Sequence, residues 1–463
     1  MFDAAFVSPS ATVTQVAEAF AAPENAVRFS VAAGPLAALA SAAPINFAAL
    51  PSLPASATVG IDPQQLVPQQ VADPSALASL TGLSLLQQLS LLQSDALTEF
   101  VVGHPEVVQS LVDEPPTARE VQLWWTALGI EVRGDLMSSA PQLVGNLEGV
   151  PFALRSTANR TFLTGAIAQL SAGSAGSAEG RSEARDASSR LSMLQKVSEA
   201  LKSPPGAPAR SLLSLDSSGA GTAAIAIGNV ATADYVSILV PGMFYTVDGQ
   251  VAEWTAAAQA LYDEQVAWVN ELGLGGTVAT VAWIGYETPS LVNFTSLDLA
   301  YEGSKALAST VSGLHSVRGD DQPYLALVAH SYGSTAAMMA LTDYGIAIDT
   351  IGIIGSPGSS AQSAADLGVP NDCVYVGEAD WDQVKDSAFF GSDPGSDSFG
   401  AHRFRVGGGV DPLTGEGLLG SIGHDQYLMV GSESLRNLAL ITLGQGRLVT
   451  ADGGAGLSKG AAD

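Results

Sequence analysis

The feature that most constrains the fold is a short segment around Ser331. Residues 324–328 form an apolar run typical of a strand buried on both faces, and residues 334–341 are rich in helix formers. Between them lies Ala329-His330-Ser331-Tyr332-Gly333. Small residues two positions before and after a serine, in a strand-to-helix turn, are typical of a nucleophile elbow. The segment therefore predicts Ser331 as a nucleophile, with the backbone N–H of Tyr332 facing a developing oxyanion.

From about residue 206 the hydrophobic pattern alternates between strands and helices. The expected strands cover residues 211–215, 221–227, 235–240, 278–284, 324–328, 351–354, 373–376 and 402–406. The expected helices cover residues 251–272, 296–317, 334–341 and 432–443. This alternation predicts an α/β domain with a largely parallel sheet covered on both faces. Its functional site should lie at the carboxyl ends of the strands.

A serine nucleophile needs a base, and His424 is the best candidate among the five histidines. In the α/β-hydrolase order of serine, acid and histidine, the base follows the serine, which excludes His104 and His315. His330 lies on the elbow itself, where we expect its side chain to point elsewhere, and His402 falls within an expected strand. His424 lies in a Gly-containing loop after the last strand and before the last helix.

The acid of such a triad should follow the expected strand 373–376. Two carboxylates qualify there, Asp380 and Asp382, and only one of them can be buried against the histidine. Asp382 is favoured because Val384 can anchor its turn. Asp380 remains the alternative.

A second oxyanion donor should come from the loop after the strand 235–240. Pro241-Gly242-Met243 allows close backbone approach, so the N–H of Met243 is the candidate donor. Phe244 and Tyr245 follow directly and are expected to shape the substrate pocket. Residues 283–286 end a strand at the same sheet edge, so Tyr286 is a further pocket candidate, although core packing of Trp283 is equally compatible with the pattern.

Composition changes divide the chain. A break at residues 115–116 precedes Thr117, which can cap a helix together with Glu120. The expected division is a helical region rich in Ala, Leu and Pro at 1–118, a helical segment packing on or covering the core at 119–205, a catalytic domain at 206–450 and a flexible tail at 451–463.

The charge pattern restricts partners and location. A formal net charge of −27 disfavours nucleic acid and anionic membrane surfaces. Residues 29–61 carry no charge, but four prolines interrupt them, so we expect no stable membrane span. No basic residue precedes Arg28, so a classical signal peptide is not expected, which leaves a cytoplasmic protein or one exported by another route. The oligomeric state stays open.

No metal-ligand spacing, phosphate loop or dinucleotide fingerprint occurs in the sequence. We therefore expect no cofactor and no metal. Cys373 is the only cysteine, so no disulfide can form within the chain.

The sequence resembles an actinobacterial α/β-hydrolase family catalogued as a domain of unknown function. The resemblance covers residues 121–444 and lies in Val240-Pro241-Gly242-Met243, Ala282-Trp283-Ile284-Gly285-Tyr286 with Pro289, His330-Ser331-Tyr332-Gly333-Ser334, Phe399-Gly400-Ala401 with His424 and Tyr427, Trp124-Trp125, and Gly145-Asn146-Leu147-Glu148-Gly149-Val150-Pro151 with Arg155 and Ala158-Asn159-Arg160. Ala329 stands where glycine is more usual. The resemblance implies a serine-hydrolase fold with Ser331, an aspartate and His424 in triad roles, and no common substrate.

These features predict a serine hydrolase that acts on carboxylic esters, esterase-like or lipase-like, with a small-molecule or lipid-like ester as its substrate. The same triad could instead serve an acyltransferase or an amidase. A different class of function also stays open, because residues 1–205 exceed what a hydrolase core needs. They could form a partner-binding or secretion-related helical module on a hydrolase scaffold.

Overall fold

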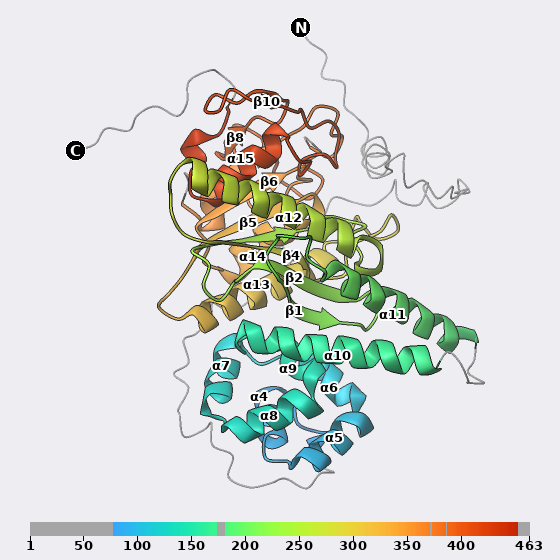
Figure 1. The fold of residues 1–463 in the computed structure, drawn as a ribbon. Coiled ribbons are helices and arrows are strands. Elements are labelled where there is room, and N and C mark those ends of the chain that lie inside the picture. The colour runs from blue at the N-terminus through green and yellow to red at the C-terminus, as the bar shows by residue number, and fades with distance from the viewer. Residues whose placement is uncertain (1–76, 174–180, 371–372, 386, 452–463) are drawn as a thin grey trace.

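The computed structural model describes residues 77–173, 181–370, 373–385 and 387–451. The expectations for residues 1–76 and for the tail after residue 451 lie outside the described residues. At the centre is an eight-stranded sheet of order β1-β2-β4-β3-β5-β6-β7-β8 (Figure 1). Its strands are β1 (Arg210–Asp216), β2 (Thr222–Gly228), β3 (Tyr235–Val240), β4 (Val278–Ile284), β5 (Tyr324–His330), β6 (Thr350–Ile354), β7 (Val374–Gly377) and β8 (His402–Phe404).

The sheet is mostly parallel, as the alternation of strands and helices predicts. β2 runs antiparallel to both of its neighbours, β1 and β4, whereas the pairs from β4 to β8 are parallel. A small hairpin of β9 (Gly409–Val410) and β10 (Gly417–Leu418) follows β8. The predicted α/β architecture is confirmed, and β3 and β4 have the bounds expected from the apolar runs.

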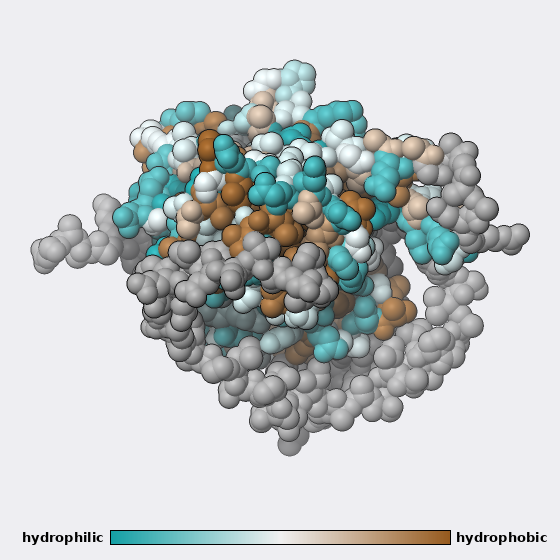
Figure 2. Space-filling view, turned by 90° about the horizontal axis from the view of Figure 1, so that it is seen from below, coloured by the Kyte–Doolittle hydropathy of each residue, from teal (hydrophilic) through white to brown (hydrophobic). Residues whose placement is uncertain are grey.

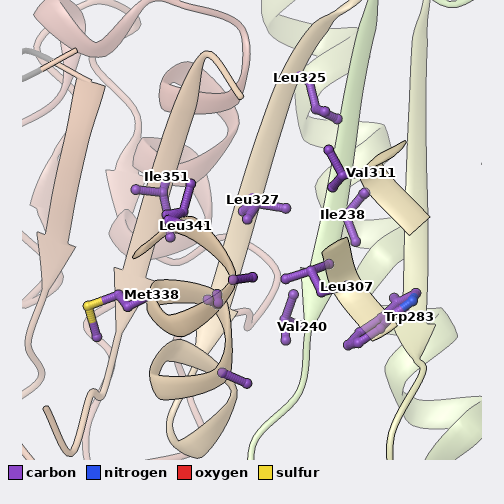
Figure 3. Packing of buried hydrophobic residues seen from close by; sticks show 14 of the residues in the cluster. Ile238, Val240, Trp283, Leu307, Val311, Leu325, Leu327, Met338, Leu341 and Ile351 are labelled. Atoms are coloured by element: carbon purple, nitrogen blue, oxygen red, sulfur yellow. The ribbon is translucent and has the colours of Figure 1, made fainter. Parts of the chain in front are cut away.

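Helices cover both faces of this sheet. α13 (Asp298–Arg318) and α14 (Tyr332–Tyr344) pack on one face, where Ile238, Leu307 and Leu327 interlock (Figure 3). α12 (Val247–Glu271) and α15 (Glu433–Thr442) pack on the other face. The central strands are buried on both sides, which explains why they read as continuous apolar runs rather than as alternating patterns.

A group of helices gathers beyond β1 and has a core of its own (Figure 1). Its members are α4 (Gly82–Leu89), α5 (Ser94–Gly103), α6 (Pro105–Asp113), α7 (Ala118–Ala127), α8 (Ile130–Ser139) and α9 (Pro141–Asn146). Leu89, Trp124 and Trp125 are buried together there, so one core contains residues from both sides of position 118. The predicted capping box is present, with Thr117 and Glu120 bonding each other's backbone N–H groups.

The end of the molecule that carries these helices mixes apolar and hydrophilic surface (Figure 2). Val102 of α5 and Ile130 of α8 are large apolar residues exposed in this group. Among the described helices, none is both long and apolar enough to cross a membrane.

Polar side chains close the outer edge of β1. α10 (Phe152–Gly173), which leads on to α11 (Arg181–Ala200), supplies Ser156 and Asn159, and α9 supplies Asn146. Asn146 accepts from the Leu215 N–H at 2.9 Å and donates to the Leu215 carbonyl at 2.8 Å. Ser156 and Asn159 bond the N–H and the carbonyl of Leu212. These side chains take the place of a neighbouring strand and remove an exposed sheet edge.

A buried ion pair reinforces this contact. Arg155 of α10 bonds both carboxylate oxygens of Glu148, with Nη2 to Oε1 at 2.8 Å. α13 approaches so closely that a Cβ on Gly313 would lie 2.1 Å from Glu148. Burial raises the pKa of Glu148 although Arg155 acts in the opposite direction. We call Asn146, Glu148, Arg155, Ser156 and Asn159 the β1 joint.

Candidate active site

Ser331 lies at the turn between β5 and α14 in a strained conformation, with φ 54° and ψ −133°. Non-glycine residues rarely adopt positive φ values, and such strain collects at functional sites. The turn is tightly packed, since a Cβ on Gly333 would lie 2.3 Å from the Pro241 carbonyl oxygen. Ser331 is fully buried, and its Oγ has no hydrogen-bond partner among the described residues.

The two expected oxyanion donors flank this serine. Tyr332 is the first residue of α14, and the first N–H groups of a helix have no partner within it. Met243 follows Gly242, where an added Cβ would lie only 2.5 Å from Ser331 Cβ. In the described part of the chain, neither the Tyr332 nor the Met243 N–H donates to a backbone carbonyl. Both N–H groups therefore belong to residues at or next to the Ser331 turn and make no backbone hydrogen bond there.

His424 and Asp382 meet in a buried hydrogen bond of 2.9 Å between Nδ1 and Oδ1. The Val384 N–H donates to the same Asp382 oxygen at 2.9 Å, and the Tyr427 hydroxyl donates to the other oxygen at 2.6 Å. Burial opposes ionisation of Asp382, but the bonds from His424, Tyr427 and Val384 outweigh it and lower the pKa of the carboxyl. Asp382 is thus an ionised acceptor that keeps the proton of His424 on Nδ1.

The alternative acid, Asp380, meets the loop of His424 through its backbone. Its side chain is exposed, and its backbone carbonyl accepts the Gly423 N–H at 2.8 Å. Val384 is fully buried, as the choice of Asp382 assumed. The structure therefore brings Asp382, and not Asp380, to His424.

Three loops converge beside the end of β6. The Ser331 N–H donates to the Ile354 carbonyl at 2.9 Å. A Cβ on the next residue, Gly355, would lie 3.1 Å from the His424 ring and 2.9 Å from Asp382 Oδ2. Gly355 has a φ of 56°, so glycine suits both the backbone and the space. Serine, histidine and aspartate, which are far apart in the sequence, thus share one small region.

The His330 side chain points toward the loop of His424, where its Nε2–H donates to the His424 carbonyl at 2.8 Å and the two rings lie 4.7 Å apart. Burial, with a further contribution from His424, lowers the pKa of His330 to about 3, so the ring is neutral. The local pattern could not predict this contact, because the loop that carries His424 returns to β5 only in the folded chain.

The expected pocket residues separate into two groups. Phe244 and Tyr245 are half-buried, and the Tyr245 ring lies 4.8 Å from Trp254 and 6.4 Å from His330. Tyr286, by contrast, is buried and stacked on Trp283. Its hydroxyl donates to the Pro241 carbonyl at 2.8 Å and supports the Met243 turn from behind.

Sequence reasoning gave no role to Tyr427, whose hydroxyl connects two backbone segments of the site. It donates to Asp382 and accepts the Ala379 N–H at 2.8 Å. Its sequence signals are its position three residues after His424 and its place in the motif that carries the family resemblance. Within the described ranges, no group of three or more His, Cys, Asp or Glu side chains is arranged to hold a metal ion. The absence of a cofactor stays a prediction.

Comparisons with known proteins agree with this architecture. Residues 216–392 match a family model described as "Alpha/beta hydrolase". The uncharacterized protein Rv2079 of Mycobacterium tuberculosis is 29% identical over 399 residues, which cover 73% of this chain and 57% of that protein. The uncharacterized protein Mb0988c of Mycobacterium bovis is 28% identical over 246 residues, which cover 50% of this chain and 89% of that protein. This chain therefore spans little more than half the length of Rv2079.

Solved structures with a similar arrangement include a Pyrobaculum calidifontis esterase, with 16% identity and a TM-score of 0.31 over 61% of this chain and 97% of that chain. A Pseudomonas putida esterase has 14% identity and a TM-score of 0.26 over 62% of this chain and 94% of that chain. The resemblance to an actinobacterial α/β-hydrolase family is confirmed by the family model together with the mycobacterial relatives.

Proposed function

We propose that this chain, whose residues 216–392 belong to the alpha/beta-hydrolase family, is a serine hydrolase that acts on carboxylic esters. Ser331 is the nucleophile, His424 the base, and Asp382 the residue that orients the base. The backbone N–H groups of Tyr332 and Met243 form the oxyanion hole.

One observation carries the proposal. The buried Asp382–His424 hydrogen bond of 2.9 Å lies against Gly355. Gly355 directly follows Ile354, whose backbone carbonyl accepts from the Ser331 N–H. An ionised acid, a histidine protonated on Nδ1 and a serine on a strained elbow are the parts that nucleophilic catalysis requires. A purely structural role does not account for a fully buried serine hydroxyl without a partner, because an unmade buried hydrogen bond costs free energy.

In the first half-reaction, Ser331 Oγ attacks the ester carbonyl carbon while its proton moves to His424 Nε2. The negative charge on the former carbonyl oxygen is stabilised by the Tyr332 and Met243 N–H groups. The imidazolium that forms is stabilised by Asp382. When the tetrahedral intermediate breaks down, His424 gives the proton to the leaving alcohol, and Ser331 carries the acyl group.

In the second half-reaction, water replaces the alcohol. His424 removes a proton from the water, the hydroxyl adds to the acyl carbon, and the same oxyanion hole is used again. Collapse releases the carboxylic acid and returns the proton from His424 to Ser331. An alcohol or an amine that competes with water at this step would give a transferase, and product analysis with added acceptors separates these outcomes.

The direct test is labelling with a fluorophosphonate, followed by intact mass spectrometry and peptide mapping. We expect one adduct, on Ser331, and its loss in Ser331→Ala and in His424→Ala. Ser331→Ala should also lower kcat for activated esters by at least about a thousandfold. Ser138→Ala, at an exposed position on α8, is the matched serine control and should change neither result. Turnover that survives Ser331→Ala would contradict the proposal.

A further inference from the structure

The segment between β4 and α13 crosses over the candidate site and is held at both ends by residues of the oxyanion region. The Phe244 N–H donates to the Pro289 carbonyl at 3.0 Å, and the Tyr332 hydroxyl donates to the Ser296 carbonyl at 2.6 Å. Between these two points Asn293 Oδ1 accepts the Ser290 N–H at 2.7 Å and forms a turn. We call residues 289–296 the strap.

The strap has an inner and an outer side. Phe294 is 4% exposed and packs against Met243, with the half-buried Phe244 and Phe389 beside it. Val292, two residues earlier, is 88% exposed. Phe389 also packs against the large core on the face of the sheet that α13 and α14 cover. The strap therefore presents one aromatic side chain inward, beside a proposed oxyanion donor.

Aromatic contacts extend this cluster to the second donor. The rings of Phe294 and Phe389 lie 6.0 Å apart, those of Phe389 and Phe390 lie 4.9 Å apart, and those of Phe390 and Tyr332 lie 5.4 Å apart. A continuous apolar surface thus runs from Met243 to Tyr332, the two residues that flank the nucleophile. Its members come from the loops after β3, β4 and β7 and from the start of α14.

An ester carbonyl held by the Met243 and Tyr332 N–H groups must place one of its two substituents against this surface. Met243, Phe294 and Phe389 carry no polar group that could replace lost hydration, so a charged substituent would be strongly disfavoured there. An apolar substituent would gain from each buried methylene. Ser331 is fully buried, so a substituent bound beside it would contact protein side chains rather than bulk water.

Building on the proposed function, we propose that Met243, Phe294 and Phe389 form an acyl-binding wall and that Phe294 limits the length of the acyl chain. The substrates are then esters of uncharged, apolar carboxylic acids. Phe294 determines the specificity for acyl-chain length, while the reaction itself depends on Ser331, His424 and Asp382.

The test compares Phe294→Ala, Phe294→Leu and wild type with p-nitrophenyl esters from acetate to dodecanoate and with a negatively charged hemisuccinate ester. We expect Phe294→Ala to move the preferred chain length upward and to change the ratio of kcat/KM between long and short esters by at least about tenfold. Phe294→Leu should lie between the two. Val292→Ala, on the outer side of the strap, is the control and should keep the wild-type profile.

Fluorophosphonate labelling of Ser331 in every variant distinguishes this proposal from the proposed function. Intact labelling with an unchanged chain-length profile in both Phe294 variants would overturn the wall alone. No labelling and no ester turnover in wild type would overturn the proposed function and the wall with it. If Phe294→Ala does not fold, as judged by thermal unfolding, then Phe294→Leu and Phe389→Leu carry the same test. Efficient cleavage of the hemisuccinate ester would also overturn the wall.

Discussion

Asp382 at the candidate active site and Glu148 at the β1 joint are both buried carboxylates paired with a basic side chain. Each also lies against a glycine whose Cβ would collide with it, Gly355 and Gly313 respectively. Their pKa values nevertheless shift in opposite directions: burial raises the pKa of Glu148, whereas hydrogen bonds lower the pKa of Asp382 despite burial.

The difference lies in the donors. Asp382 accepts from His424, from the Tyr427 hydroxyl and from the Val384 N–H, which together outweigh the cost of removing the charge from water. Glu148 accepts from Arg155, and these two bonds do not fully offset burial. The joint uses a partner that is always charged and so holds helices against an edge strand. The site uses a histidine, which can take up and release a proton during a reaction.

The largest expected effect is on kcat, and it should appear when Asp382 is changed but not when Glu148 is changed. Asp382→Asn keeps the shape of the side chain but loses the charge that orients His424, and we expect kcat to fall by about 10⁴-fold. Glu148→Gln should leave kcat per folded molecule unchanged. Both are measured by ester turnover normalised to the folded fraction. A folded Asp382→Asn enzyme with full activity would show that the site does not work as proposed.

The next effect concerns stability at the β1 joint. Glu148→Ala leaves Arg155 buried without its carboxylate, and we expect the free energy of unfolding to fall by about 3–5 kcal/mol. Replacing both residues with leucine should recover much of this loss. Urea unfolding measures it, with Glu114→Ala as the control, because the Glu114–Lys305 pair is exposed and should contribute about 0–1 kcal/mol. Equal losses for the two pairs would contradict the role of burial.

Tyr427→Phe should have an intermediate effect, since it removes a bond to an ionised group and leaves the Ala379 N–H without its acceptor. We expect a loss of about 1.5–3 kcal/mol in the free energy of unfolding. The lowered pKa of Asp382 gives stability that is present above the unfolded value and lost as pH falls through the folded value. Loss of the Tyr427 hydroxyl raises that folded pKa, so the acid-dependent loss of stability should be smaller and should be complete at a higher pH. Tyr301→Phe, at an exposed position, should leave the pH curve in place.

The smallest effect near neutral pH is expected at His330. Its folded pKa is lowered from 6.5 to about 3, so below 6.5 the unfolded chain binds a proton that the folded chain excludes. The contribution of His330 to the free energy of unfolding is fully present above pH 6.5. It is lost as the pH falls toward 3, with a slope of about 1.4 kcal/mol per pH unit. Glutamine can still donate to the His424 carbonyl but does not titrate. His330→Gln should therefore lower by one the number of protons taken up when the protein unfolds in this pH range. If the free energies of unfolding of wild type and variant change equally with pH over this range, the assignment is refuted.

Sequence patterns predicted the sheet well because its central strands are buried on both faces. Apolar runs such as 235–240 and 278–284 match β3 and β4, and the elbow around Ser331 needed only local sterics. The order of serine, acid and histidine selected His424 and reduced the acid to two candidates. The same reasoning left the role of Tyr286 open, since a residue at the end of a strand can face the core or the site and the one-dimensional pattern does not distinguish them.

The remaining contacts join segments that are distant in the sequence. His330 is 94 positions from His424, and Tyr427 is 45 positions from Asp382. The Gly145–Arg160 motif was recognised, but its role at the edge of β1 depends on Leu212 and Leu215, which lie 53 to 69 positions away from their asparagine partners. Hydrogen bonds between such segments depend on how the loops return to the sheet, and periodicity carries no information about that.

By itself, the sequence determined which segments are strands and helices, where the strained serine lies, and which histidine is free of any regular element. Those properties follow from side-chain size, polarity and spacing along the chain. Only the tertiary structure decided that Asp382 rather than Asp380 meets His424, that His330 bonds the His424 carbonyl, and that Phe294 packs against Met243. Each of these depends on which of several compatible residues is buried against a distant partner, and that choice exists only once the loops have packed.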